Sequence, residues 1–200
     1  MRLGGWALSL GLAGLGALSG AAATALAVEW AGRSDWAGPN PWQTSLLAGA
    51  RAADPFTRAV IARSSLLALN RQETIYFARK TDDAGQPLDA KCTYLLSGKG
   101  LPARWWSYTL YDEAHFLARN RDNAPSIDAS RVAGKGAEGF VARISNVPGP
   151  EPFWISSRHS GRFELVARLY NPTAQAQADP RQVELASITK LACQDGKPAP

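Results

Sequence analysis

The fold of this chain is decided by the stretch Trp105-Trp106-Ser107-Tyr108-Thr109-Leu110-Tyr111-Asp112. Aromatic and β-branched residues favour strands, and successive side chains of a strand point to opposite faces of a sheet. The odd positions share one face, on which two aromatic rings flank two hydroxyls: Trp105, Ser107, Thr109 and Tyr111. The even positions form the larger uninterrupted apolar surface, and we expect them in the core: Trp106, Tyr108 and Leu110.

Six more segments have a strand-like composition and are separated by Gly, Pro, Asn and Asp residues: 74–78, 92–96, 140–144, 153–156, 163–170 and 183–188. Asp82-Asp83-Ala84-Gly85 has the composition of a turn, so the first two segments are expected to form a hairpin. Strands and helices do not alternate after residue 73, which argues against a doubly wound sheet. The sequence therefore predicts a mainly β fold with a helical N-terminal part, as an antiparallel β-sandwich or jelly-roll-like domain behind one N-terminal transmembrane helix.

Residues 3–28 contain no charged side chain. As a helix, about 26 residues at 1.5 Å each span about 39 Å, which exceeds the roughly 30 Å hydrocarbon core of a bilayer. Trp6 and Trp30 lie near the two ends, where indole rings favour the membrane–water boundary. We expect residues 1–28 to form a retained membrane anchor. The alternative is a secretory signal segment that is cleaved after Ala25-Leu26-Ala27.

Location and partners follow from this segment. Arg2 and the terminal amine favour a cytoplasmic N-terminus, which predicts an inner-membrane protein with its globular domain in the periplasm. If the segment is cleaved near Ala27, the domain is instead secreted to the periplasm. The lipid bilayer is the expected partner of the helix, and an envelope glycan or protein is the expected partner of the domain. The net charge of +5 is spread along the chain without a basic block, so nucleic acid is not expected as a partner.

The chain after the anchor is predicted to form a connector and one domain. The connector and a first helix occupy 29–53, where Trp42 lies among Gly and Pro residues and is not expected to pack. The β-rich domain covers 54–193, and 194–200 is a flexible tail. About 170 residues after the anchor are enough for one domain with its own core.

Two helices are expected before the first strand. The weaker prediction covers 43–53. The stronger begins at Asp54-Pro55, because Asp can cap the free N–H groups of a helix and Pro at the first helical position loses no hydrogen bond. Together these helices are expected to lean on the sheet as a helical hairpin.

The two cysteines of the chain are Cys92 and Cys193. An even pair in an exported chain predicts a disulfide, which closes a loop of about 100 residues and contributes up to about 4–5 kcal/mol in the chain-entropy model. The alternative is a pair of buried apolar thiols. No CxxC motif or neighbouring histidine accompanies them, so they do not indicate a metal site.

The stretch from Pro102 to Asp112 also resembles a known family. Its core is Trp106-Ser107, Thr109 and Tyr111-Asp112, supported by Tyr76-Phe77, by 81–88, and by 120–127 and 163–172. Over roughly 54–172 the chain is similar to the bacterial family called domain of unknown function 1214, in its short membrane-anchored form. The resemblance implies a β-rich envelope domain and carries no agreed catalytic residues. Family members often have Arg-Tyr-Ser where this chain has Ala124-Pro125-Ser126.

Several motif-like strings do not indicate a site. Gly134-Lys135-Gly136-Ala137-Glu138-Gly139 matches a dinucleotide fingerprint, but a strand-like segment follows it instead of a helix. Asp112, Glu113 and His115 have ligand chemistry, yet three such residues at a strand end are typical of a solvated turn. His159 and Ser160 lack the setting of a hydrolase nucleophile. No catalytic residue, metal or cofactor is expected.

The stronger candidate for a binding site is the odd face of the stretch 105–112, extended by an arginine in the apolar segment 163–170. The candidate ligand-binding residues are Trp105, Ser107, Thr109, Tyr111, Asp112 and Arg168. Arg168 has two interpretations, because it can grip an anionic ligand or pair structurally with Asp112 or Glu164. Both faces of the stretch can also be covered by protein, which would leave no site.

Three function classes remain open. The leading one is a membrane-tethered, non-catalytic envelope module that binds a surface glycan, lipid or protein. The second is an exported hydrolase acting on a polysaccharide or ester, for which a deep pocket joining Asp112, Arg168 and His115 would be evidence. The third is a structural subunit that pairs through an exposed sheet edge.

Overall fold

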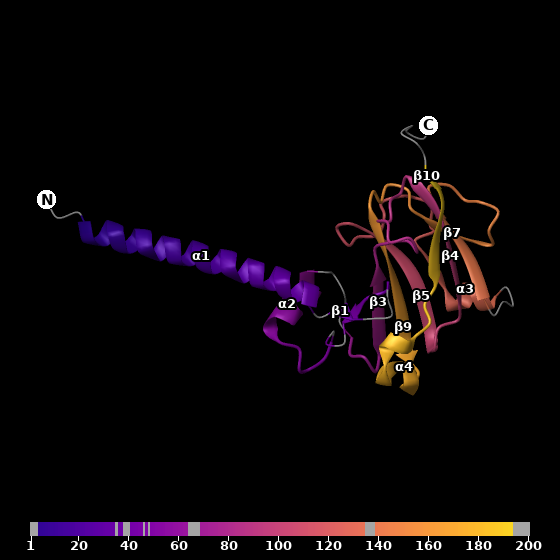
Figure 1. The fold of residues 1–200 in the computed structure, drawn as a ribbon, viewed down its shortest axis with the longest axis horizontal. Helices are drawn as coiled ribbons and strands as arrows, with labels where there is room; N and C mark the ends of the chain where they lie inside the picture. Colours follow the sequence, from indigo (N-terminus) through magenta and orange to yellow (C-terminus); the bar gives the residue numbers. More distant parts are fainter. Residues whose placement is uncertain are drawn as a thin grey trace.

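The computed structural model describes residues 4–34, 36–37, 41–45, 47, 49–63, 69–134 and 139–193. A long helix, α1 (Gly4–Ser34), extends away from a body built of β-strands (Figure 1). The body contains two four-stranded sheets, and one cluster of buried side chains combines residues from both of them. The mainly β fold with a helical N-terminal part is therefore confirmed.

The two sheets have the orders β3-β9-β5-β6 and β10-β4-β7-β8. The strands of the first sheet are β3 (Thr74–Arg79), β9 (Phe163–Pro172), β5 (Ala103–Asp112) and β6 (Ser126–Asp128). Those of the second are β10 (Ser187–Cys193), β4 (Cys92–Lys99), β7 (Gly139–Ser145) and β8 (Phe153–Ser156). All neighbouring strands are antiparallel except β7 and β8, which run parallel.

The even side chains of β5 lie in the core, as predicted. Trp106 is 4% exposed, and Tyr108 and Leu110 are also buried. The rings of Trp106 and Tyr108 lie 5.3 and 5.6 Å from the ring of Phe140 on β7, which belongs to the opposite sheet. The even face of β5 therefore joins the two sheets through aromatic contacts, and the odd face lies on the outside of the sandwich.

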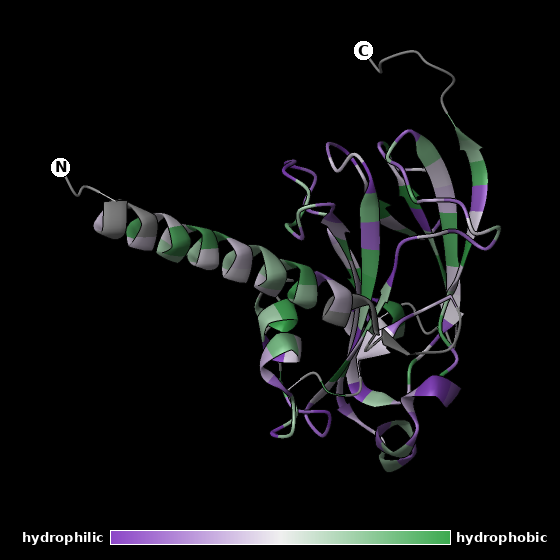
Figure 2. Cartoon of the chain, turned by 60° about the vertical axis from the view of Figure 1, so that its left-hand side comes forward, coloured by the Kyte–Doolittle hydropathy of each residue, from purple (hydrophilic) through white to green (hydrophobic). Residues whose placement is uncertain are grey.

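Helix α1 is long and apolar enough to cross a membrane over Ser9–Trp30 by length and composition, a test that a signal sequence also passes. It extends six residues beyond the predicted anchor, to Ser34. Figure 2 shows hydrophobic residues along the length of this helix. Trp6 and Trp30 near its two ends are exposed, and so are the leucines of the helix whose side chains the structure describes: Leu10, Leu12, Leu15, Leu18 and Leu26. A helix with an apolar surface all round is not suited to water, so this surface needs another environment.

The helix start predicted at Asp54-Pro55 is confirmed. Helix α2 (Pro55–Arg63) begins there, and Asp54 Oδ1 accepts hydrogen bonds from the backbone N–H groups of Phe56 and Thr57 at 2.8 and 3.2 Å. The Thr57 hydroxyl and these N–H groups hold the pKa of Asp54 below its usual range. Helix α2 packs against α1, as Figure 1 also shows.

The helix predicted over 43–53 is wrong for the described residues of that range. Thr44–Ser45 forms the short strand β2, which pairs with β1 (Trp36–Ala37), and Gln43 exchanges backbone hydrogen bonds with Ala78 of β3. Gly49 then adopts a φ of 69°, which a helix does not allow. Pairing with the edge of β3 satisfies the backbone of this segment in an extended form.

Trp42 is not part of an unpacked connector. Its side chain is 3% exposed in the common core, with its ring 5.6 Å from that of Tyr108. Its indole Nε1 donates to the carbonyl oxygen of Ala186 at 2.9 Å. Burial of an indole with its N–H satisfied is strongly favourable, which explains why this residue fixes the incoming chain to the sandwich.

The hairpin predicted from the first two strands is also wrong, because β3 and β4 belong to different sheets. The turn itself forms, since Asp82 Oδ1 accepts from the N–H groups of Ala84 and Gln86 and Gly85 has a φ of 77°. The chain then crosses from one sheet to the other, and Leu88 is inserted into the core on the way. Period two predicts a strand but does not identify its partner.

The last strand begins later in the chain than predicted. The prediction placed a strand over 183–188, but the observed strand begins at Ser187. The residues before it include a short helix α4 (Ala174–Ala178) and a 3-10 turn, η1 (Pro180–Gln182). Val183 and Ala186 are nevertheless buried in the core. Strand β6 and the short helix α3 (Ala129–Ala133) were not predicted. The predicted tail, 194–200, lies outside the described residues.

The predicted disulfide is confirmed. Cys92 and Cys193 are directly opposed in the register of β4 and β10, and their sulfurs are bonded across a sequence separation of 101 residues. The bond fixes the last described strand to the middle of the second sheet, which limits the freedom of the unfolded chain.

Arg79 is a buried cation at the end of β3, with only 2% of its surface exposed. Its guanidinium donates to Asp83 Oδ1 at 2.8 Å and lies 5.8 Å from the ring of Trp42. The same carboxylate accepts from the Ile188 N–H and the Thr189 hydroxyl of β10, each at 3.0 Å. Asp83 therefore connects the edge of one sheet to the edge strand of the other.

Replacement of the two neighbouring tryptophans of β5 separates core from surface. Trp106→Ala should cost about 3–5 kcal/mol of unfolding free energy, because it removes a buried ring and leaves a cavity. Trp105→Ala should cost at least about 1 kcal/mol less, since that ring is already partly in water. Urea denaturation of the full chain in detergent micelles measures both. A larger loss for Trp105→Ala would contradict the face assignment.

Acid should weaken the sandwich through Asp83. Burial raises its pKa, but hydrogen bonds from Ile188, Arg79 and Thr189 outweigh burial and lower the pKa below the ordinary 3.8. A lowered pKa in the folded state means that Asp83 contributes stability above about pH 3.8–4 and loses that contribution as the pH falls through the folded pKa.

Asp83→Asn should therefore be less stable than the native chain at pH 7, and the difference should shrink as the pH falls below about 4. Urea denaturation at a series of pH values measures this difference. Glu113→Gln, at an exposed carboxylate, is the control and should show no comparable change. A difference for Asp83→Asn that stays constant down to about pH 2 would contradict the role of the carboxylate.

Candidate functional site

The outside of the first sheet, which we call the outer face, is defined by cross-strand register. In its central row, Ser107 of β5 lies opposite Arg168 of β9, which lies opposite Tyr76 of β3. One neighbouring row pairs Trp105 with Tyr170. These two rows therefore bring three aromatic rings and a hydroxyl around one arginine.

Two further rows continue the outer face toward the other end of β5. Thr109 is paired with Val166, and Tyr111 is paired with Glu164. These rows add a second hydroxyl, a fourth aromatic ring and a carboxylate. The outer face thus combines aromatic rings with two charged residues of β9, Glu164 and Arg168. It also includes Asp128 of β6, which lies opposite Ser107 in the central row.

Arg168 lies at the centre of the outer face between two tyrosines. Its Nη2 donates to the Tyr111 hydroxyl oxygen at 2.8 Å. Its guanidinium carbon lies 5.0 Å from the Tyr111 ring and 5.8 Å from the Tyr76 ring, within the range of a cation–π interaction. The structural pairing expected with Asp112 or Glu164 is replaced by this hydrogen bond to Tyr111.

Tyr76 supports Arg168 from the edge strand. Its side chain is largely buried, and burial raises the pKa of its hydroxyl. The hydroxyl therefore stays protonated at any physiological pH, and the ring acts as a neutral surface under the guanidinium.

Trp105 forms the other aromatic part of the outer face. Its ring lies 5.3 Å from that of Tyr170, and its Nε1 donates to the Ser130 hydroxyl at 3.0 Å. About a third of its surface, 36%, remains exposed. The ring is thus held in one orientation by its neighbours while it still presents a surface to solvent.

Ser107 and Thr109 lie between these aromatic groups and are mostly buried. Among the residues that the structure describes, neither hydroxyl has a hydrogen-bond partner. A recessed hydroxyl without a protein partner loses part of its hydration without compensation. A ligand that offers a donor or acceptor at this point would restore the missing hydrogen bond.

Asp112 belongs to a turn and not to the cluster around Arg168. Its Oδ1 accepts from the backbone N–H groups of Ala114 and Phe116 at 3.0 and 2.9 Å. The turn places His115 over Glu164, with 2.7 Å between His115 Nδ1 and Glu164 Oε1. Lys80 Nζ lies 3.5 Å from the other oxygen of this buried carboxylate.

A small pocket with a volume of about 250 Å³ joins Asp112, His115 and Glu164. Arg168 is not among the residues that line it. The pocket joining Asp112, Arg168 and His115, which would be evidence for an enzyme, is therefore not formed around these three residues. Glu164 and His115 instead orient each other through their hydrogen bond at the end of the outer face.

The odd positions of β5 and Arg168 were predicted as parts of the site, whereas Tyr76 and Tyr170 were not. Both tyrosines lie in segments that were correctly predicted as strands. The missing information was the register that places them beside Arg168 and Trp105. The available signal was the position of Tyr170 two residues after Arg168, which places both on one face of their strand.

The fold and this surface define a β-sandwich module whose family can be identified. A family model described as protein of unknown function DUF1214 matches residues 73–174, which include the whole outer face. The chain belongs to this family, as its sequence resemblance indicated.

A solved structure shares the fold at low sequence identity. The VPA0106 protein from Vibrio parahaemolyticus is 18% identical with a TM-score of 0.55, over 70% of this chain and 36% of that chain. A putative uncharacterized protein from Burkholderia cenocepacia is 16% identical with a TM-score of 0.37, over 92% of this chain and 53% of that chain. The chain thus spans about a third to a half of the length of these proteins. Among curated proteins, none matches the chain.

The Arg168–Tyr111 hydrogen bond should contribute measurably to stability. Tyr111→Phe keeps the ring but removes the acceptor, and should cost about 1 kcal/mol, near the middle of the range for one net hydrogen bond. Tyr170→Phe is the matched control, because its hydroxyl has no partner within the described part of the chain. Urea denaturation should distinguish the two variants. Equal stability of both variants and the native chain would contradict the interaction.

Proposed function

We propose that this protein is a membrane-tethered, non-catalytic module of the cell envelope that binds a carboxylate-bearing glycan on the outer face. The observation that carries the proposal is the row Tyr76–Arg168–Ser107, in which a central guanidinium lies between aromatic rings and next to a hydroxyl that lacks a partner among the described residues.

The chemistry of the row fits an acidic sugar. Flat aromatic side chains such as Trp105 offer an apolar surface on which the less polar face of a sugar ring can stack. Arg168 presents the fork of donors that matches a carboxylate, while its two tyrosine contacts keep it in place. Ser107 and Thr109 offer hydroxyls for the sugar oxygens.

The acidic and nucleophilic side chains near the outer face are already held by other protein groups, which favours binding over hydrolysis. A glycosidase needs two carboxyl groups that flank the scissile bond. Glu164 is held by His115 and Lys80, and Asp112 is held by two N–H groups of its turn. The Ser160 hydroxyl donates to the Ser157 carbonyl, and not to a base among the described residues.

The proposed location is the inner membrane with the sandwich in the periplasm. The exposed apolar surface of α1 supports a retained anchor, and Arg2 at its short end supports a cytoplasmic N-terminus. The Cys92–Cys193 disulfide supports an oxidising compartment for the domain. An envelope glycan would be within reach of a domain tethered in this way.

Calorimetric titration of the full chain in detergent micelles tests the proposal. The probe is an oligogalacturonate, and a neutral galacto-oligosaccharide of equal length is the reference ligand. The acidic sugar should bind and the neutral one should bind at least about tenfold more weakly, because it lacks the carboxylate that pairs with Arg168. Arg168→Gln should weaken binding of the acidic sugar by about 1.5–3 kcal/mol.

The outside of the other sheet provides a matched control. Arg143 lies on β7 and pairs with Glu151 at 2.6 Å, and Arg143→Gln removes the same charge from the other sheet. This variant should bind the acidic sugar as the native chain does. Equal weakening by Arg143→Gln and Arg168→Gln, or equal affinity for the acidic and neutral sugars, would contradict the proposed site.

A further inference from the structure

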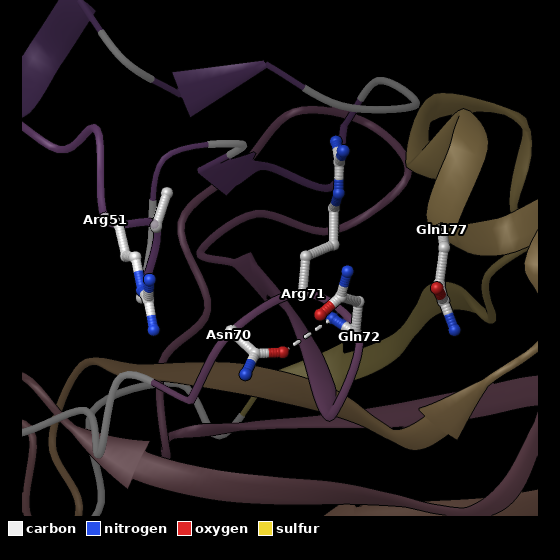
Figure 3. Close-up of a pocket in the computed structure, with 7 residues that line it drawn as sticks. Arg51, Asn70, Arg71, Gln72 and Gln177 are labelled. Carbon is white, nitrogen blue, oxygen red and sulfur yellow. Dashed lines mark hydrogen bonds between the residues drawn. The ribbon is translucent and has the colours of Figure 1, made fainter.

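A second concavity, which we call the basic concavity, lies between the loop after β2, the turn before β3 and helix α4. It has a volume of about 520 Å³, and its polar lining residues are Arg51, Asn70, Arg71, Gln72 and Gln177. Figure 3 shows that these side chains come from three separate segments and surround one open space. None of the lining residues is acidic.

Gln177 uses its side-chain donor on the carbonyl oxygen of Pro172 at 2.8 Å, whereas the two arginines of this concavity are not engaged within the described part of the chain. Neither Arg51 nor Arg71 has a hydrogen-bond or ion-pair partner for its guanidinium there. Asn70 Oδ1 already accepts from the N–H groups of Gln72 and Glu73, so the remaining capacity of that amide is its NH₂ donor. Two uncompensated cations and an amide donor around one space favour an anionic ligand.

The basic concavity is connected to the N-terminal helices. Arg58 of α2 donates to the backbone carbonyls of Ala53 and Arg51 at 2.9 and 3.0 Å, so α2 holds the loop that carries Arg51. Helix α2 in turn packs against α1 (Figures 1 and 2). Ala27 and Val28 are half-buried, whereas the other described side chains of α1 are exposed, which places the α2 contact near the end of the apolar span.

We propose that the basic concavity binds the phosphate-bearing headgroup of an anionic phospholipid in the leaflet nearest the sandwich. The guanidinium groups of Arg51 and Arg71 would pair with the phosphate, and the Asn70 amide would donate to a phosphate or glycerol oxygen. Arginine next to a membrane also gains from the negative potential of an anionic leaflet. Free phosphate offers the same charged oxygens, but its binding would not depend on the nearness of α1.

This inference rests on the proposed role of α1 as a retained anchor. Native mass spectrometry of the full chain in detergent, doped with equal amounts of dioleoyl phosphatidylglycerol and dioleoyl phosphatidylcholine, tests the headgroup site itself. The native chain should retain one phosphatidylglycerol in preference to phosphatidylcholine. The double variant Arg51→Gln/Arg71→Gln should lose this preference by about thirtyfold, as expected for two arginines near a membrane surface.

Two further variants separate local recognition from net charge. Arg51→Lys/Arg71→Lys keeps the charge and should retain most of the preference. Arg131→Gln/Arg181→Gln removes the same charge from exposed arginines elsewhere and should retain all of it. Equal retention of both lipids by the native chain, or equal losses in the two Gln double variants, would overturn the proposal.

Two other measurements distinguish the sources of failure. Stabilisation of the native chain against heat by inorganic phosphate alone, without a preference for phosphatidylglycerol, would overturn the lipid headgroup in favour of a free anion.

Carbonate extraction of native membranes tests the anchor separately. Protein that is released but still prefers phosphatidylglycerol in detergent would contradict the tether while supporting the headgroup site. Protein that stays in the membrane but shows no preference would overturn the headgroup site alone.

Discussion

The alternation of side chains along β5 is the constraint on which the rest of the structure depends. The strand is paired with β9 over nearly its whole length, and this pairing fixes the register of the two strands. A slip of one residue would move Trp105 into the core and Trp106 onto the surface. Because Trp106 packs on Phe140 of the other sheet, the register that closes the sandwich also determines which residues form the outer face.

The same register explains why Arg168 belongs to the site. Arg168 lies in a largely apolar strand, and its two chain neighbours, Ala167 and Leu169, are buried in the core. The guanidinium must therefore lie outside, where Tyr111 and Tyr76 supply a hydrogen bond and ring contacts. A charge held in this way is neither buried without compensation nor neutralised by a carboxylate, so it remains able to bind an anion.

Local patterns in the sequence located most of the long strands of the sandwich but not their partners. Period two located β3, β4, β5, β7, β8 and β9, and the chemistry of Asp54-Pro55 located the start of α2. The partner of β3 was missed because the crossing near Leu88 depends on packing between sheets. Trp42 was missed for a similar reason, since the core that buries it is assembled from residues far away in the sequence, such as Tyr108.

The candidate site shows the same limit, because Tyr76 and Tyr170 required the register of three strands. The basic concavity was not predicted at all, since residues that meet only through tertiary structure leave no periodic signal.

Hydroxyl-radical footprinting of the full chain tests most directly whether β5 presents its even face to the core and its odd face to a ligand. The modification of each tryptophan is read by mass spectrometry with and without oligogalacturonate. We predict rapid modification of Trp105, slow modification of Trp106, and protection of Trp105 alone of these two when the acidic sugar is present. Equal modification of the two tryptophans, or an unchanged rate at Trp105 with saturating sugar, would contradict the account.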